Sequence, residues 1–171
     1  AENGCTYAGG IVAHTSGMVF NCSSSTQIAN AFAVGGIVGY SSNIIRNCYY
    51  EIFDAEKPSL SSEVVNDGSV AFCCVGGLVG RYEGASIIAS YVLSFTQSAN
   101  VSEIYSTETA GGLVGSAPFG VTISSSYFYG KIKAKTVGGL VGEVGTSSDS
   151  TTITNTFTAG LLEVLENGKG A

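Results

Sequence analysis

Charged residues are scarce in this chain, and proline, histidine and tryptophan are nearly or entirely missing. Asp, Glu, Lys and Arg make up 12% of the 171 residues, and there are two prolines, one histidine and no tryptophan. The net charge of −6 argues against a nucleic-acid partner, because basic patches bind nucleic acids. No apolar run approaches the roughly 20 residues of a membrane span, so we expect no direct membrane insertion. A signal-peptide pattern is also missing, and with Ala1 as first residue we expect a processed or trimmed product.

Residue patterns that make metal and catalytic sites are equally sparse. No Cys-x-x-Cys or Cys/His spacing indicates zinc. The sole imidazole, His14, has no Ser or Cys partner in a recognisable motif, so we expect it at the surface. Asp67-Gly68-Ser69 and Ser148-Asp149-Ser150 are turn signals, too short for the ligand series of an EF-hand. We therefore expect no metal, no cofactor and no enzymatic activity.

Glycine, in contrast, is abundant, and its positions repeat. The 24 glycines include five copies of the pentapeptide Gly-Gly-(Ile/Leu)-Val-Gly, the first copy ending in Ala13 instead of Gly. The central positions of the motif are Gly10, Gly36, Gly77, Gly112 and Gly139, each followed two residues later by Val12, Val38, Val79, Val114 and Val141. Five copies in one chain indicate an internal repeat.

Each pentapeptide is predicted to be a strand. In the second copy, alternation would turn Val34 and Val38 to one face and Ile37 to the other. A single glycine-rich strand would be weak, because glycine loses the most entropy on folding and packs nothing. Copies stacked on one another would instead let backbones approach closely and align the valines in one ladder, which is the arrangement of a solenoid.

A second feature follows each pentapeptide: an apolar residue, then one or more small or polar residues, then an aromatic residue. Only the first copy lacks the aromatic residue. Aligned on the ring, one column reads Cys22, Cys48, Ser90, Ser126 and Thr156. The column before it reads Asn21, Asn47, Ala89, Ser125 and Asn155. Small polar residues in register favour a tight corner between strands, and stacked Asn side chains can form ladders.

Gly-Gly-Leu-Val-Gly followed by Asn-Cys-Tyr resembles the GLUG motif, a short repeat of bacterial IgA peptidases, adhesin-like surface proteins and other large extracellular proteins. The resemblance covers nearly the whole chain as five units. It implies extracellular or cell-surface display of a secreted protein. It does not imply peptidase activity, since the metallopeptidase zinc motif is missing.

The expected fold is all-β, a parallel β-solenoid (β-helix) of about five rungs spaced about 4.8 Å apart, in approximate units 1–30, 31–70, 71–106, 107–133 and 134–171. Two of the repeat units are longer than the others. Both carry their extra residues at the same point of the repeat, after the aromatic residue and before the next Gly-Gly pair, around Asp54 to Ser69 and Thr96 to Thr109. We expect two loop insertions on one face, a face that often binds. Residues 161–165 have helical spacing, but alignment of Gly160 with Gly130 puts Leu162 under Ile132 and favours a strand.

The cysteines leave two interpretations open. Cys22 and Cys48 share a column in successive rungs, and strands about 4.8 Å apart satisfy the roughly 4.4–6.8 Å Cα separation of a disulfide. They could equally be two small buried thiols. The adjacent Cys73 and Cys74 would point to opposite faces and not pair with each other. The odd total of five leaves a thiol for another chain, and Cys5 is the candidate.

Three groups of residues invite functional interpretations, each with a simpler structural one. The acidic set Glu51, Asp54, Glu56, Glu63 and Asp67 could supply paired carboxylates, or could be a solvated loop. Carbohydrate stacking or a rung-on-rung aromatic ladder could explain Tyr49, Tyr50, Tyr91, Tyr127 and Tyr129, and repetition favours the ladder. The N-glycosylation pattern occurs at Asn21 and Asn100, of which Asn100 lies in an insertion.

The function expected from these patterns is structural: an adhesive segment, stalk or filament part without chemistry of its own. Its expected partners are neighbouring repeats or other copies end to end, with host or matrix glycans and proteins as further candidates. The alternative is a glycan-binding or polysaccharide-cleaving β-helix that uses the insertion face. Neither end of the sequence carries a polar capping element, so we expect an interior slice of a longer stack.

Overall fold

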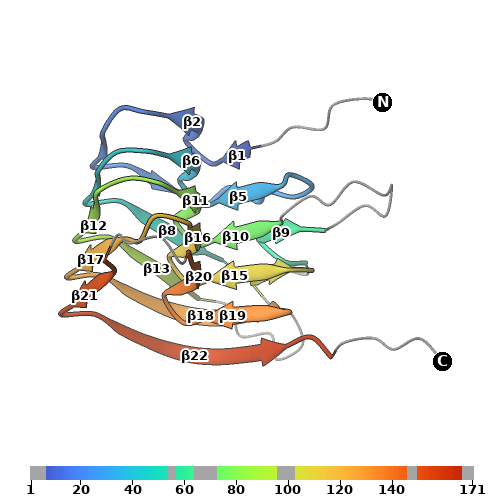
Figure 1. Ribbon diagram of the computed structural model, residues 1–171. Helices are drawn as coiled ribbons and strands as arrows, with labels where there is room; N and C mark the ends of the chain where they lie inside the picture. Colours follow the sequence, from blue (N-terminus) through green and yellow to red (C-terminus); the bar gives the residue numbers. More distant parts are fainter. Residues whose placement is uncertain (1–6, 54–56, 64–72, 96–102, 146–149, 167–171) are drawn as a thin grey trace.

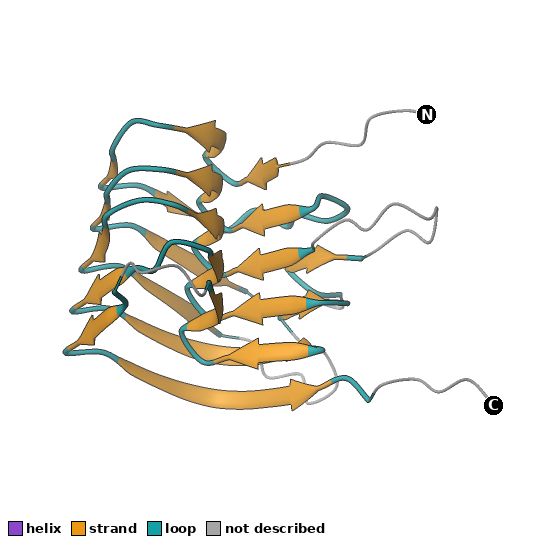
Figure 2. Ribbon diagram, in the orientation of Figure 1, coloured by secondary structure: helices purple, strands orange, loops and turns teal. Residues whose placement is uncertain are grey.

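The computed structural model describes residues 7–53, 57–63, 73–95, 103–145 and 150–166, and every helix or strand within them is a β-strand. Figure 2 shows strands joined by short loops. Within the described residues there is also no helix long and apolar enough to cross a membrane. The strands form four sheets, A to D, and their pairings are parallel. The predictions of an all-β chain and of parallel, stacked strands are confirmed.

Each sheet takes strands from all parts of the chain. Sheet A consists of β1 (Tyr7–Gly9), β5 (Ala33–Gly35), β10 (Cys74–Gly76), β15 (Thr109–Gly111) and β19 (Thr136–Gly138). Sheet B consists of β2 (Val12–Thr15), β6 (Val38–Ser41), β11 (Val79–Tyr82), β16 (Val114–Ala117) and β20 (Val141–Val144). Sheet C consists of β3 (Val19–Phe20), β7 (Ile45–Arg46), β12 (Ser86–Ile88), β17 (Thr122–Ser124) and β21 (Thr152–Thr154). Sheet D consists of β4 (Ser23–Ser24), β8 (Tyr49–Ile52), β9 (Leu60–Ser62), β13 (Tyr91–Ser94), β14 (Ile104–Ser106), β18 (Tyr127–Ala134) and β22 (Phe157–Val164).

The chain passes through sheets A, B, C and D in that order and then returns to sheet A. We call one such passage a rung; the described strands make five, beginning at β1, β5, β10, β15 and β19. In Figure 1 successive rungs lie one below the other, with the N-terminal rung at one end of the stack and the C-terminal rung at the other. Each of the three interior rungs hydrogen-bonds to the rungs before and after it, as the sequence repeat requires.

Equivalent residues of successive rungs lie in columns, and the inward columns make the core. Val12, Val38, Val79, Val114 and Val141 pair in register along sheet B. A second inward column, in sheet C, is Val19, Ile45, Ile87, Ile123 and Ile153. These residues each lie four positions before the ring-aligned position at which the sequence was aligned, so the structure keeps that alignment in register. The next residue of each strand points outward, so Phe20 is exposed and Ile88, in the same column through Arg46, is half-buried.

The pentapeptide is a corner, which corrects the prediction of one continuous strand. The chain bends at Gly36 and Ile37 between β5 and β6, and the N–H groups of Ile37 and Val38 both donate to the carbonyl of Leu78 (3.0 Å each). The bend breaks the alternation of faces, so Val34, Ile37 and Val38 are all fully buried. A Cβ on Gly36 would lie closer than 3.0 Å to the backbone of the next rung and to the ring of Tyr50. Close backbone approach therefore requires glycine at this corner.

A second corner joins sheets C and D. One residue of each rung has a positive φ there: Asn21 (54°), Asn47 (51°), Ala89 (48°), Ser125 (50°) and Asn155 (52°). This is the column of small residues that the sequence placed at a tight corner. Asn tolerates the left-handed conformation better than other residues with a Cβ, and Asn47 Nδ2 also donates to Asn21 Oδ1 (3.2 Å).

The extra residues of the long rungs leave the stack within sheet D. In the fourth rung β18 is continuous, whereas in the third the corresponding length is split into β13 and β14, and both pair with β18. The second insertion is therefore shorter than predicted, because Ile104–Ser106 and Thr109 are already in strands. The first is likewise interrupted by β9. Residues 161–165 are strand through Val164, and Leu162 pairs with Ile132 as the alignment indicated.

Candidate functional site at the open end of the stack

The acidic residues of the first insertion are only partly within the described residues. Glu51 lies on β8, half-buried on the outer face of sheet D, and Glu63 is exposed just after β9. Asp54, Glu56 and Asp67 lie outside the described residues. In the described ranges no group of three or more His, Cys, Asp or Glu side chains could hold a metal ion. Of the five acidic residues, Glu51 and Glu63 are therefore the two that the structure describes.

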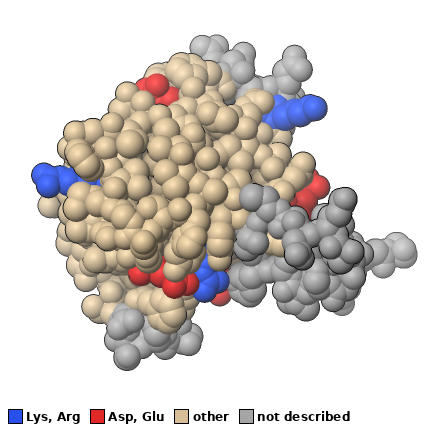
Figure 3. Space-filling model, turned by 90° about the horizontal axis from the view of Figure 1, so that it is seen from above, with Lys and Arg blue, Asp and Glu red and all other residues tan. Residues whose placement is uncertain are grey.

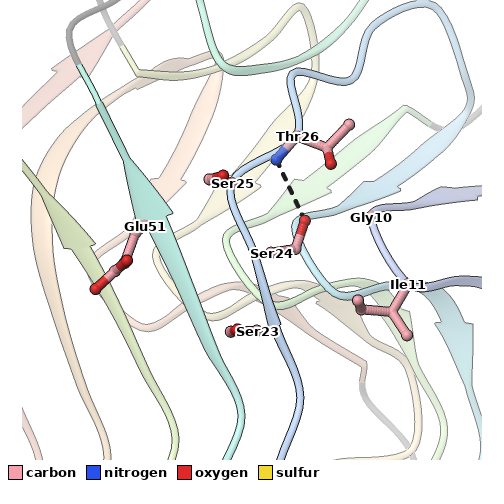
Figure 4. Close-up of a pocket in the computed structure, with 7 residues that line it drawn as sticks. All are labelled: Gly10, Ile11, Ser23, Ser24, Ser25, Thr26 and Glu51. Atoms are coloured by element: carbon pink, nitrogen blue, oxygen red, sulfur yellow. Dashed lines mark hydrogen bonds between the residues drawn. The ribbon is translucent and has the colours of Figure 1, made fainter.

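Glu51 borders a shallow hollow at the N-terminal end of sheet D (Figure 4). The hollow, of ≈ 310 Å³, is lined by Gly10, Ile11, Ser23, Ser24, Ser25, Thr26 and Glu51. In Figure 4 the Glu51 side chain lies across the strand from the serines, and Ser24 Oγ accepts a hydrogen bond from the Thr26 N–H (3.3 Å). Hydroxyls and one carboxylate are groups that hydrogen-bond sugar hydroxyls.

The tyrosines that invited a carbohydrate reading occupy three different environments. Tyr49, Tyr91, Tyr127 and Phe157 form one ladder on the outer face of sheet D, with ring centroids 5.0, 4.9 and 4.9 Å apart and planes within 5° of parallel. Tyr50 is fully buried in the core, and Tyr129 is exposed. Because the ladder rings cover one another's faces, they leave mainly their edges for a ligand.

The four cysteines within the described residues are thiols in the structure. Cys22, Cys48, Cys73 and Cys74 are all unbridged, and Cys48 Sγ donates to the carbonyls of Arg46 (3.3 Å) and Val19 (3.6 Å). Burial raises the pKa of the Cys48 thiol and raises that of Cys74 to about 12. Cys22 and Cys48 are therefore two separate thiols in this structure and do not form a disulfide. Cys5 lies outside the described residues.

The column that contains Cys48 also shows how the rungs are tied together inside. The Cys48 N–H donates to Ser90 Oγ (3.1 Å), and the Ser90 N–H donates to Ser126 Oγ (3.2 Å). The hydroxyls of Ser90 and Ser126 thus accept hydrogen bonds from backbone N–H groups of the preceding rung. One rung earlier in the chain, Asn21 is exposed at its corner; the other glycosylation candidate, Asn100, lies outside the described residues.

His14 is exposed on β2, as expected, but it belongs to a small cluster at the corner of sheets A and B. Its ring lies 4.7 Å from that of Tyr40 and 5.7 Å from that of Tyr7. The Tyr40 hydroxyl donates to Glu83 Oε2 (2.9 Å), and Arg81 holds the other oxygen of Glu83 (2.8 Å). Burial, followed by the hydrogen bond to Glu83, raises the pKa of Tyr40.

The last rung exposes residues whose counterparts are buried in the rung before it. Ile153 is 44% exposed while its partner Ile123 is fully buried, and Leu162 is 45% exposed while Ile132 is fully buried. Val164 is also exposed, whereas Ala134 is buried. β19, β20, β21 and β22 have a paired strand on one side, and among the described residues none pairs on the other. The end of the stack is therefore an apolar surface ringed by free strand edges, the kind of surface that pairs with another chain.

The same end carries an unsatisfied carboxylate. Glu143 lies on β20, and its Oε2 is buried without a hydrogen-bond partner. Its column runs His14, Tyr40, Arg81, Ser116 and Glu143 from the first rung to the last. A buried carboxylate oxygen without a donor is costly, which marks Glu143 as a residue that needs a partner.

The sequence did not identify Glu143 as a site residue. A single glutamate in a repeat has no pattern, and its orphaned oxygen emerges only once the rungs are stacked. The exposure of Ile153 and Leu162 likewise emerges only once the rungs are stacked. Comparison of the chain with models of known families, with curated proteins and with solved structures finds no match.

Proposed function

We propose that the chain is a structural segment of a parallel β-solenoid, and that its working surface is the end of the stack, where it joins further rungs of the same repeat. The observation that carries this proposal is the exposure of Ile153 and Leu162 on the last rung, at positions that are fully buried one rung earlier. Another rung placed there would bury these side chains and pair the strand edges of β19 to β22.

The role is that of a stalk, adhesin or filament part in an extracellular or cell-surface protein, without catalytic activity. Low charge and a surface of Ser and Thr hydroxyls support a passive structural part. The resemblance to GLUG repeats supports the location, because those repeats occur in large extracellular proteins.

A charge placed on the open end tests the proposal. Leu162→Lys should abolish concentration-dependent association in sedimentation velocity, because a lysine would have to be buried between rungs. Tyr129→Lys is the matched control, since Tyr129 is similarly exposed (49%) but lies on the outer side of sheet D. Association that survives Leu162→Lys, or that is lost in Tyr129→Lys alone, would show that the chain associates through its side.

A second candidate function is glycan binding at the hollow beside Glu51, which lies at the first-rung end of sheet D. The four consecutive hydroxyl residues Ser23 to Thr26 and the one carboxylate favour it. A glycan array should give binding that Glu51→Gln and Ser25→Ala reduce at least about tenfold, the loss of one to two hydrogen bonds. An array without signal would remove this candidate and leave the structural role untouched.

A further inference from the structure

We propose that the occupant of the open end is a second copy of this chain, docked head to tail so that its first rung continues all four sheets in register. The inference rests on the proposed end-to-end function and adds the partner, the direction and the register. It is carried by the direction of the backbone hydrogen bonds, by the match of side-chain columns and by one polar pair.

The corner between sheets A and B donates hydrogen bonds in one direction along the stack. The N–H groups of Ile11 and Val12 donate to the carbonyl of Ile37 (3.0 and 3.1 Å). The same pair of bonds recurs from each rung to the next, ending with Leu113 and Val114, which donate to Leu140 (2.9 and 3.0 Å). Leu140 and Val141 hold this position in the last described rung, and no described strand follows them.

The corner between sheets C and D repeats this direction. The N–H of Asn21 donates to the carbonyl of Arg46 (3.1 Å), and the series ends with Ser125, which donates to Thr154 (3.2 Å). Asn155 has the next donor in the series. At these two corners the last rung therefore offers donors, while the first rung offers the carbonyls of Ile11 and Phe20.

This polarity distinguishes two ways of covering the end. A two-fold dimer, last rung against last rung, would set the donors of Leu140 and Val141 against the same donors of its partner and leave them unpaired. Head-to-tail docking sets them against the Ile11 carbonyl of the next copy. The second arrangement repeats the contact already made inside the chain four times between the pentapeptide corners.

Side chains at the two ends also match in this register. Inward positions would pair Val141 with Val12, Ile153 with Val19 and Leu162 with Ile28 of the second copy, all apolar. Seen from the first-rung end, the surface is largely uncharged, and the Lys, Arg, Asp and Glu side chains in view lie at its margin (Figure 3). Such a surface fits an apolar partner.

The one polar pair joins Glu143 to His14, whose imidazole carries an N–H donor. In register these residues would be neighbours in adjacent strands, about 4.8 Å apart along the stack. His14 would then lie next to the carboxylate whose Oε2 has no partner. Because the two docking ends differ, the contact does not close, and copies would add to form a rod that grows by five strand spacings, or about 24 Å, per copy.

A charge exchange across the contact tests the register. By sedimentation velocity over a concentration series, His14→Glu should weaken association about tenfold, because two carboxylates would face each other, and Glu143→Lys about threefold. The double variant His14→Glu with Glu143→Lys should return to within about threefold of the unmodified chain. Circular dichroism and thermal unfolding of each variant check that the monomer is folded.

The outcomes of these experiments separate the register, the docking direction and the end-to-end function. A double variant as weak as the His14→Glu variant, or single variants without effect, would overturn the register. Association that stops at a dimer would overturn the head-to-tail direction. If Leu162→Lys disrupts association while the charge exchange gives no rescue, the proposed end-to-end function stands and only this inference fails.

Discussion

The Glu103 carboxylate accepts a hydrogen bond from the backbone N–H of Lys131 (2.6 Å) and another from the hydroxyl of Ser94 (2.5 Å). Lys131 lies on β18 at the point where that strand passes from β13 to β14 as its neighbour. No strand of the third rung's described residues pairs with Lys131, and the side chain of Glu103 provides the acceptor for its N–H. Glu103 is buried (1% exposed), and its own carbonyl accepts from Ser59 and Leu60 of the second rung.

The first prediction concerns the pH dependence of stability. Burial raises the pKa of Glu103, and the hydrogen bonds from Ser94 and Lys131 only partly oppose this. The folded chain therefore holds this proton to a higher pH than the unfolded chain does. The stabilisation is fully present below the unfolded pKa of about 4.3 and is lost as the pH rises through the raised folded value.

Urea unfolding from pH 4 to pH 8 measures this effect. Relative to Glu103→Gln, which does not titrate, the free energy of unfolding of the unmodified chain should fall across this range. Glu63→Gln, at an exposed position, is the control and should give no such difference. A Glu103→Gln variant with the same pH profile as the unmodified chain would contradict the assignment.

The second prediction concerns the glycine corners. A Cβ on Gly112 would lie closer than 3.0 Å to the Gly139 carbonyl and to the ring of Phe128, whereas one on Gly17 would have its nearest contact at 3.5 Å, Thr15 Oγ1. Gly112→Ala should therefore cost about 1–3 kcal/mol, and Gly17→Ala should stay within about 0.5 kcal/mol of the unmodified chain. Thermal unfolding monitored by calorimetry compares the two; equal costs would show that the corner tolerates a side chain.

The third prediction is a stabilising substitution. Ala89 has φ 48°, in a column where three of the five rungs have Asn. Ala89→Asn should raise the free energy of unfolding by about 0.5–1 kcal/mol, because Asn adopts this conformation at lower cost and can extend the Asn ladder. Ala13→Asn, at an exposed strand position of ordinary φ, should not stabilise. Chemical denaturation distinguishes them, and a destabilised Ala89→Asn variant would argue against this account of the corner.

The fourth prediction concerns the aromatic ladder. Tyr91 stacks on two rings, those of Tyr49 and Tyr127, whereas Phe157 stacks on Tyr127 alone among the described residues. With about 0.5–1.5 kcal/mol for each aromatic pair, Tyr91→Leu should cost roughly twice as much stability as Phe157→Leu. Equal losses in urea unfolding would mean that burial, not stacking, decides the contribution of these rings.

The register of the fold could be predicted from the repeat, because equivalent residues of identical units must fall in columns. Leu162 under Ile132 and the valine column of sheet B both follow from alignment alone. The bend at Gly36 could not be predicted, since glycine fits a strand and a corner equally well in sequence.

The residues of the candidate site were harder to predict than the fold. Glu103 and Glu143 each occur once, outside any repeated pattern. In the described part of the chain, no third-rung strand pairs with Lys131 beside Glu103, and no rung lies beyond Glu143 on β20; both facts emerge only once the rungs are stacked. The apolar identity of Ile153 and Leu162 is visible in the sequence, but their exposure depends on what lies beyond the last rung.

Hydrogen exchange at the backbone amides of Leu140 and Val141 tests the central claim most directly. At low protein concentration these amides should exchange quickly, while the equivalent amides of Leu113 and Val114, bonded to Leu140, should be protected. At concentrations where the chain associates, Leu140 and Val141 should become protected at least about tenfold. Fast exchange of both amides in the associated state would contradict the claim that a further rung covers this end of the stack.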